Sequence, residues 1–262
     1  MRSFTSAKEE KSRVFKKILL FLLVGVISYA SFLIATLPAS LVWKYVSPQL
    51  PLKSLQLDVK GVSGTAWKGQ LLIHSRGIEG LLGWDILFSG LLTGAIPVDL
   101  ELKSNVGLLT TKVRLLSNGI ELDDTKGDLN LSSLNPLLKK QRVTLNGEFK
   151  IDRLTMGYFD GALTAAEGLF SWTGGRVEYP AGREIHGNEF PSFTGELGQK
   201  ANVTSLTIKD AKSSINSIEA DMEHTGIATL KVKRRLLDLA NEPWPKNSSE
   251  SDVVFKVRRK IL

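Results

Sequence analysis

The sequence predicts a mainly β protein, with one N-terminal transmembrane helix followed by a curved antiparallel β-sheet domain that contains one or two short helices. Three observations predict this fold class. An uncharged apolar run lies near the N-terminus, the roughly 220 residues after it alternate repeatedly between apolar and polar side chains, and turn-forming residues separate these alternating runs. The first observation predicts the anchor, and the other two predict a meander of short strands.

The apolar run extends from Ile18 to Leu37 and contains 20 residues without a charge. A helix needs about 20 apolar residues to cross the hydrocarbon core of a bilayer. The 17 residues before it hold six Lys or Arg and two Glu, and such a basic arm favours the cytoplasmic side. We therefore expect a cytoplasmic arm over residues 1–17, a transmembrane anchor over 18–42 and an exported β domain over 43–262.

A cleavable signal peptide is the alternative interpretation of the same segment. Ser28-Tyr29-Ala30 and Leu37-Pro38-Ala39 each resemble a small-residue cleavage site. The apolar core of a signal peptide usually has about 7–15 residues, however, and this run is longer. Its length and the long basic arm favour a retained, single-pass anchor.

The formal net charge of +7 is concentrated at the N-terminus. The first 42 residues hold six basic and two acidic side chains, which leaves 28 basic and 25 acidic residues in the exported part. That balance does not support nucleic-acid binding. Two basic clusters are interpreted as solvated strand edges in preference to an anionic-lipid site: Lys231, Lys233, Arg234 and Arg235, and Lys256, Arg258, Arg259 and Lys260. The chain has no cysteine, which excludes disulfides and thiolate metal sites.

The clearest period-two alternation predicts a strand over residues 143–152, whose apolar face carries Val143, Leu145, Phe149 and Ile151. Val98, Leu100 and Leu102 repeat the pattern. Together with the turn signals, such runs predict an antiparallel meander of about ten strands. The turn signals are Asn118-Gly119, Lys126-Gly127-Asp128, Asn146-Gly147, Asp160-Gly161 and Tyr179-Pro180-Ala181-Gly182. Short helices are predicted over residues 132–140 and 234–239.

These strands create a packing problem, because each has an apolar face and the helical segments are too few to cover a large sheet. A two-sheet sandwich, a closed barrel, or a curved sheet with a filled concave face would each solve it. The scarcity of helices favours the open or half-open sheet. Its apolar groove would be lined by Val98, Leu100, Leu102, Val143, Leu145, Phe149 and Ile151, and acyl chains or a partner would fill it.

A weak internal repeat pairs a tryptophan with a glycine two residues later. Trp67 precedes Gly69, and Trp172 precedes Gly174 and Gly175. A glycine beside a tryptophan allows the ring to pack over bare backbone, so we expect a structural role in preference to ligand stacking. The repeat also predicts two similar β halves, over about 43–130 and 131–262.

No catalytic or metal-binding motif is present in the sequence. His74, His186 and His224 lie far apart, and the order of residues around Gly61 and Lys68 lacks the spacing of a phosphate-binding loop. We therefore expect no enzyme activity and no cofactor. A periplasmic hydrolase remains a rival interpretation, although it would need a polar pocket that the sequence does not indicate.

At these same landmarks the chain resembles the type II secretion system protein N family, also called general secretion pathway protein N. The matching residues are the basic arm and anchor, Leu37-Pro38-Ala39, the block from Gly61 through Gly64 and Trp67 to Gly69, Gly83-Trp84-Asp85 followed by Leu91-Leu92-Thr93-Gly94, Trp172-Thr173-Gly174-Gly175, Arg235-Leu236-Leu237 and Glu242-Pro243-Trp244. The resemblance implies a non-catalytic accessory or structural subunit of the Gram-negative machinery that exports folded proteins across the outer membrane. It also implies an anchor in the inner membrane, a periplasmic domain, and other subunits of the machinery as partners.

The chain has a remoter similarity to AsmA-like proteins, a group of membrane-anchored β proteins. Several of these are thought to carry lipid in an apolar groove. A lipid-binding or lipid-transfer protein is therefore the alternative function, and it agrees with the open sheet expected from the packing problem.

Overall fold

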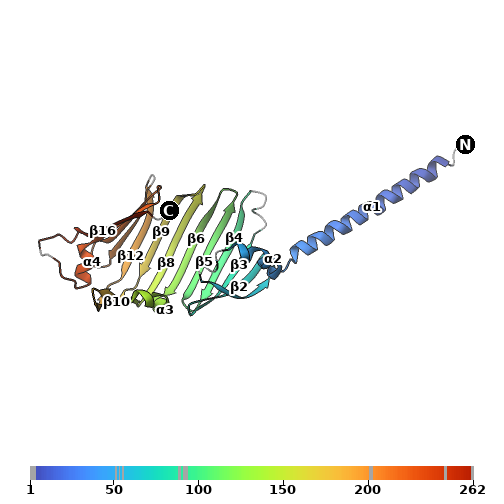
Figure 1. Cartoon of the computed structure of the whole chain (residues 1–262). Coiled ribbons are helices and arrows are strands. Elements are labelled where there is room, and N and C mark those ends of the chain that lie inside the picture. Colours follow the sequence, from blue (N-terminus) through green and yellow to red (C-terminus); the bar gives the residue numbers. More distant parts are fainter. Residues whose placement is uncertain are drawn as a thin grey trace.

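The computed structural model describes residues 4–50, 52, 54, 56–87, 90, 94–200, 203–244 and 247–260, with the backbone alone for residues 4–15. The start of the predicted cytoplasmic arm and the segment Leu91-Leu92-Thr93 lie outside the described residues. The chain forms one long helix that extends away from a broad antiparallel sheet (Figure 1).

The long helix α1 (Phe4–Ala35) contains the segment Lys16–Ala35, whose mean hydropathy of 2.6 and length of 20 residues allow it to cross a membrane. None of that segment is buried within the protein. A short helix α2 (Ala39–Val46) and a 3-10 turn η1 (Ser47–Gln49) follow directly. The predicted apolar helix is therefore present and has no protein cover.

Thirteen strands form the main sheet, and nearly all neighbours in it are consecutive in the chain. In spatial order they are β1 (Asp58–Gly64), β2 (Lys68–Ser75), β3 (Ile78–Ile86), β4 (Ile96–Ser104), β5 (Gly107–Leu116), β6 (Gly119–Asn130), β8 (Glu148–Phe159), β9 (Ala162–Trp172), β12 (Phe193–Lys200), β13 (Val203–Asp210), β14 (Asn216–Glu223), β15 (Ile227–Lys233) and β16 (Val253–Lys260). All the pairings are antiparallel.

A smaller sheet of three strands uses the segments that the main sheet skips. Its order is β11 (Glu184–Phe190), β10 (Gly175–Ala181) and β7 (Thr144–Leu145). The helical turns η3 (Leu131–Leu134), α3 (Asn135–Leu138) and η4 (Lys139–Gln141) precede β7, and α4 (Arg234–Leu239) follows β15. The two short helical segments predicted from the sequence are thus confirmed.

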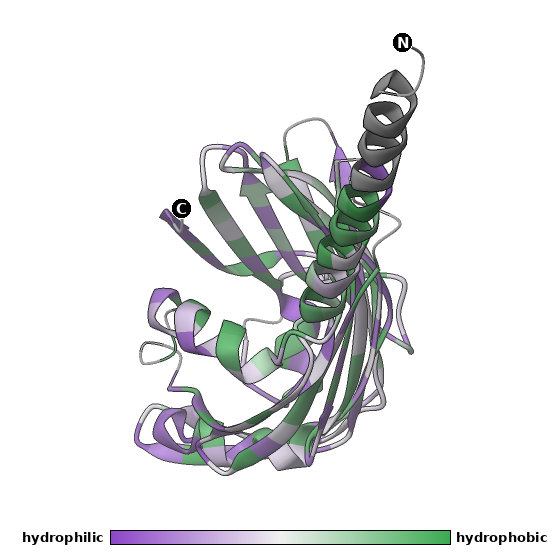
Figure 2. Ribbon diagram, turned by 90° about the vertical axis from the view of Figure 1, so that its right-hand side faces the viewer, coloured by the Kyte–Doolittle hydropathy of each residue, from purple (hydrophilic) through white to green (hydrophobic). Residues whose placement is uncertain are grey.

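Seen along its length, the main sheet is bent into a trough that is open on one side (Figure 2). The two outermost strands, β1 and β16, do not pair with each other, so the sheet is open and the barrel alternative is wrong. Paired residues of an antiparallel sheet point to the same face. The pairs Val98↔Val113 and Phe193↔Trp172 lie on one apolar face, where Val98, Val113 and Phe193 are buried. The predicted curved, open, mainly β fold is confirmed.

Three local predictions from the sequence need correction. The strand expected over 143–152 is broken: β7 ends at Leu145, β8 begins at Glu148, and Gly147 between them has a φ of 95°. Val143 lies outside both strands. Lys126-Gly127-Asp128 is no turn but part of β6, where Gly127 makes room for Leu109 on the neighbouring strand. Tyr179 to Ala181 likewise belongs to β10, and the turn starts at Gly182.

Candidate functional site: the apolar trough

The concave face of the main sheet, which we call the apolar trough, carries one row of side chains from each strand. In β3 to β6 this row includes Leu82, Leu102, Leu109 and Leu129, and in β8 to β14 it includes Phe149, Phe170, Phe193, Leu206 and Ile218. Most of these side chains are half-buried because few elements cover them. The trough is therefore an extended apolar surface that remains partly open to solvent.

A roof lies over the trough from β8 to β14, and between roof and sheet is a partly open cavity of about 670 Å³. The floor of the cavity includes Phe149, Phe170 and Ile208. The roof is formed by residues of β7, β10, β11 and α4, namely Leu145, Val177, Tyr179, Phe190, Leu236 and Leu237. Apart from Ser171, Tyr179 and Glu242, the side chains around this cavity are apolar, so it suits an apolar occupant.

Aromatic rings organise the floor of this cavity. Phe149 stacks on Phe170 with 6.0 Å between ring centroids, and Trp172 stacks on Phe193 at 5.7 Å. Both pairs have an interplanar angle of 17°. Stacked rings of this kind add about 0.5–1.5 kcal/mol each to what their buried area contributes. The floor is consequently lined by stacked aromatic rings.

A buried ion pair holds α4 over the trough. The side chain of Asp210, at the end of β13, is fully buried, and that of Arg235 in α4 is 16% exposed. Arg235 donates from Nε to Oδ2 at 2.9 Å and from Nη2 to Oδ1 at 3.0 Å. The hydrogen bonds from Arg235 lower the pKa of Asp210 against the opposing effect of burial. Such a bidentate pair fixes both the position and the angle of the short helix.

A polar network closes one end of the roof. The Tyr179 hydroxyl donates to Glu242 Oε1 at 2.7 Å, and Nδ1 of His186 lies 2.6 Å from the same oxygen. Asn188 Nδ2 donates to the carbonyl of Ala240 at 2.7 Å. Burial, together with the hydrogen bond to Glu242, raises the pKa of Tyr179, while the hydrogen bonds from Tyr179 and His186 lower that of Glu242. The network joins the β10–β11 hairpin to the segment after α4.

The structure brings together only part of the groove predicted from the sequence. Leu145 and Phe149 line the roofed cavity, but they do so from opposite sides, Leu145 from the roof and Phe149 from the floor. Asn135 fixes Leu145 by accepting from its backbone N–H at 2.8 Å and donating to its carbonyl at 3.1 Å. The other predicted groove residues within strands lie on the concave face outside the cavity lining: Val98, Leu100, Leu102 and Ile151.

Trp84 and Trp172 each pack against a glycine, but these Trp–Gly pairs are not the ones that the sequence repeat indicates. The indole of Trp84 donates to the Ala66 carbonyl at 3.0 Å, and a Cβ at Gly69 would lie 2.5 Å from its ring. The indole of Trp172 donates to the Asn146 carbonyl at 2.8 Å, and a Cβ at Gly147 would lie 2.7 Å from its Nε1. Trp84, not Trp67, is therefore the counterpart of Trp172.

Trp67 instead joins the sheet to the long helix. Its indole donates to the carbonyl of Ile34 in the last turn of α1 at 2.7 Å. The backbone N–H of Ala66 donates to the Leu37 carbonyl at 2.7 Å, and Pro38 forms a β-bridge with Thr65. Gly64 ends β1 with a φ of 91°, and this conformation shapes the turn that leads into Thr65. A Cβ at Gly61 would meet no close neighbour. This joint ties the apolar helix to the first hairpin.

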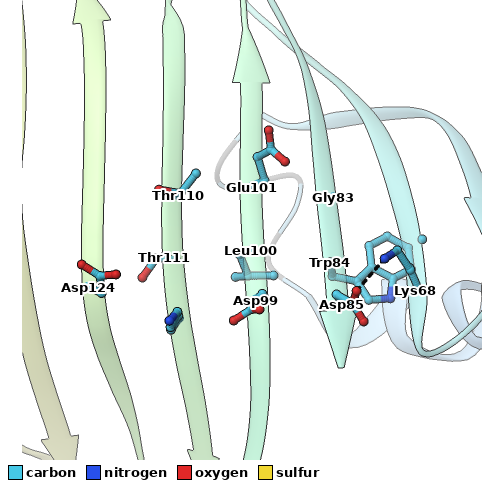
Figure 3. Close-up of a pocket in the computed structure, with 12 residues that line it drawn as sticks. Lys68, Gly83, Trp84, Asp85, Asp99, Leu100, Glu101, Thr110, Thr111 and Asp124 are labelled. Carbon is cyan, nitrogen blue, oxygen red and sulfur yellow. Dashed lines mark hydrogen bonds and ion pairs between the residues drawn. The ribbon is translucent and has the colours of Figure 1, made fainter. Parts of the chain in front are cut away.

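A polar hollow of about 430 Å³ lies over β2 to β6 (Figure 3). In it Lys68 donates to Asp85 at 2.7 Å, and Asp99, Glu101 and Asp124 lie on neighbouring strands. Among the residues that the structure describes, no group of three or more His, Asp or Glu is placed to hold a metal ion. Of the remaining predicted motif residues, Gly174 and Gly175 have positive φ values after β9, and Trp244 packs edge-on against Phe255 of β16.

Comparison with known proteins identifies the family of the chain. The family model described as type II secretion system, protein N matches residues 56–236, more than two thirds of the chain. The chain belongs to the type II secretion system protein N family. This family is a component of the secretion machinery and is not known as an enzyme. No curated protein and no solved structure matches the chain. The matched range includes Trp67, both Trp–Gly contacts and the start of α4, whereas the residues of the joint on the helix side, Ile34, Leu37 and Pro38, precede it.

Proposed function

We propose that the protein is a non-catalytic accessory or structural subunit of the type II secretion system, held in the inner membrane by α1 with its β domain in the periplasm. The observation that carries this proposal is the family match over residues 56–236. Two features support the location. The segment Lys16–Ala35 is apolar and uncovered, and a basic arm precedes it.

The joint at Trp67 supports a retained anchor. A signal peptide leaves the mature protein, so cleavage after Ala39 would lose the hydrogen bonds of the folded domain to that segment, and cleavage after Ala30 would leave their acceptors on a stub of α1. Here the Trp67 indole and the Ala66 N–H donate to carbonyls at Ile34 and Leu37. Cleavage after Ala30 would remove most of α1, and cleavage after Ala39 would also remove both carbonyls.

The location is tested with reporters that are active only outside the cytoplasm, fused to either end of the full chain. We expect activity from the C-terminal fusion and none from the N-terminal fusion. N-terminal sequencing of the purified protein should find the original start. A mature protein that begins at Ser31 or Ser40 would contradict the anchor.

The role in secretion is tested by deleting the gene in its host and measuring secreted proteins in the medium. We expect secretion to fall and the folded cargo to accumulate in the periplasm, with recovery on expression of the full chain. A version in which a cleavable signal replaces residues 1–37 serves as the matched control, and it should not restore secretion. Normal secretion in the deletion strain would contradict the proposal.

The roofed cavity favours a second candidate function, the binding of lipid acyl chains in the apolar trough. Its volume of about 670 Å³ and its apolar lining would accommodate part of an acyl chain. Mass spectrometry of lipid extracted from detergent-purified protein tests this function. Stoichiometric lipid that decreases in a Val177→Asp variant of the roof would support it. An empty trough in wild-type protein would exclude it.

A further inference from the structure

The main sheet ends at β16 with a free edge. This strand pairs with β15 on one side, and no strand in the described part of the chain pairs with its other side. The unpaired N–H and C=O groups of an edge strand form a template for another strand. Seven of the eight residues of β16 are exposed.

The opposite edge of the sheet differs from β16 in its regularity. β1 contains a bulge between Val59 and Gly61, ends at the positive-φ Gly64 and packs against α2. β16 pairs in unbroken register with β15 from Phe255 to Lys260. A bulge and a covering helix are common protections of an edge, and β16 has an irregularity only at its start, next to Val253. The regular part of β16 is therefore geometrically able to accept a further strand.

Apolar and basic side chains alternate along this edge from Phe255 to Arg258, and Arg259 and Lys260 follow. Phe255 and Val257 continue the apolar trough and are 52% and 57% exposed. Lys256, Arg258 and Lys260 lie on the other face. Arg258 pairs with Glu223 at 3.3 Å, whereas Lys256 and Lys260 have no ion pair among the described residues. One face therefore offers a positively charged row to a neighbouring strand, and the other offers Phe255 and Val257 followed by the basic Arg259.

Lys256 also stands directly opposite Lys231 of β15. Like charges that face each other across two strands are destabilising. Lys231 is partly compensated by Asp221 at 2.8 Å, on the side away from β16. A carboxylate on the far side of β16 would supply the charge that Lys256 lacks.

We propose that the β16 edge binds an extended segment of another protein in which acidic and apolar residues alternate. The segment would add a strand to the sheet, with its acidic residues beside Lys256, Arg258 and Lys260 and its apolar residues beside Phe255 and Val257. Main-chain hydrogen bonds supply affinity in such strand addition, and the side chains supply selectivity. Edge pairing with a second copy of β16 is disfavoured, because it would bring two basic rows together.

The position of β16 in the cell rests on the proposed function. β16 lies twelve strand spacings from β1, and at about 4.8 Å per spacing this is roughly 60 Å along the sheet from the anchored end. Figure 1 shows β16 and α1 at opposite ends of the molecule. That separation favours a protein partner over the surface of the anchoring membrane as the occupant of this basic edge.

A synthetic peptide provides a direct test with the full chain in detergent. The probe is a capped, fluorescent peptide of about eight residues, the length of β16, in which glutamate alternates with valine or phenylalanine. Fluorescence anisotropy should detect saturable binding that weakens as salt is added. A peptide with lysine in place of glutamate should not bind, and neither should one with proline at alternate positions, which cannot form the ladder.

The double variant Lys256→Glu with Lys260→Glu should lower the affinity at least about tenfold, because it reverses the charge that the peptide meets. Lys139→Glu with Lys140→Glu is the matched control, since both lysines are exposed and lie in η4. It should bind the peptide as the wild type does. Circular dichroism checks that both variants keep the β fold.

Crosslinking locates the contact, and the absence of cysteine from the chain makes it specific. A cysteine-tagged probe should form a disulfide with Val257→Cys and not with Leu169→Cys, an exposed position in the central strand β9. Equal affinity of the two charge variants, or equal crosslinking at the two positions, would overturn the proposal. So would absent peptide binding together with charge-dependent binding of anionic vesicles. Binding in detergent does not depend on secretion, so a failure here is separate from a failure of the proposed function.

Discussion

The half of the trough formed by β2 to β6 and the half formed by β8 to β15 present the same apolar face to different surroundings. The first, the open half, carries no roof in the described structure apart from the helices at its anchored end. The second, the roofed half, is covered by β7, β10, β11 and α4. The cover comes from two places where the chain leaves the meander, between β6 and β8 and between β9 and β12, and from the helix after β15. A similar strand pattern is thus left uncovered in one half and partly roofed in the other, according to the segments that lie between the strands.

A charge placed in each half should give the largest difference. Phe170 lines the roofed cavity, whereas Leu100 lies on the concave face of the open half, between Trp84 and Thr111 on the neighbouring strands. An unpaired carboxylate among apolar side chains costs several kcal/mol. The Phe170→Glu variant should therefore lose its fold and show no cooperative unfolding transition. Leu100→Glu should remain folded because its carboxylate can reach water. Thermal unfolding by circular dichroism and protease resistance measure both. Equal effects of the two variants would show that the roof does not separate the halves.

Removing the ion pair that holds α4 is expected to cause the next largest loss of stability. Asp210→Ala leaves Arg235 without its buried partner and should destabilise the protein by about 3–5 kcal/mol. The control is Asp221→Ala, whose partner Lys231 is 29% exposed, and it should cost about 1 kcal/mol or less. Denaturant unfolding gives both values. A small loss in Asp210→Ala would mean that α4 is held mainly by its apolar contacts.

Glycine substitutions test the close contact between Trp84 and the backbone in the open half. A Cβ at Gly69 would lie 2.5 Å from the Trp84 ring, so Gly69→Ala should destabilise the protein by about 1–3 kcal/mol. At Gly61 the nearest atom to a Cβ is 4.0 Å away, in Leu72, and Gly61→Ala should be nearly neutral. The intrinsic fluorescence of the tryptophans should change in the first variant and not in the second.

The smallest expected effect is a loss of stability of the roofed half as the pH falls. The pKa of Asp210 in the folded protein lies below the ordinary value of 3.8 because Arg235 donates hydrogen bonds to its carboxylate. Its contribution to stability is complete above about pH 5, and it is lost as the pH falls through 3.8 towards the folded pKa. Asp210→Asn should have a flatter stability profile between about pH 5 and 3 than the wild type. Parallel profiles would assign the acid sensitivity to other carboxylates.

Local patterns in the sequence were enough to predict the trough, but they did not predict its roof. Alternation such as Val98, Leu100 and Leu102 is set by the geometry of a single strand, so it identifies the apolar face directly. The hairpins at Asn118-Gly119 and Asp160-Gly161 also depend on local conformation, and both are present. About ten strands were expected where the structure has more, because strands such as β9 and β14 contain alanine and glutamate with no clean alternation.

The sequence contains no such local pattern for contacts between distant segments, so these contacts could not be predicted. Asp210 and Arg235 are 25 residues apart, and neither residue type nor spacing indicates that they meet. The contact of Trp84 with Gly69 follows from the register of β2 on β3, which a search for neighbouring Trp and Gly could not find. The break at Gly147, which moves Leu145 from the floor to the roof, depends on the pairing of β7 with β10. The division into two similar halves remains a prediction.

The order of strands in the main sheet has a consequence for how the protein is made. From β1 to β6 each strand pairs with the one synthesised just before it, so the sheet can grow by adding hairpins at its free edge as the chain emerges. Short-range pairings of this kind close small loops and form early, whereas pairings between distant segments are slower. The joint at Trp67 would then form first and β16 last. Until α4 has been synthesised, the aromatic floor of the roofed half stays exposed, and during that interval the nascent protein is most vulnerable to aggregation.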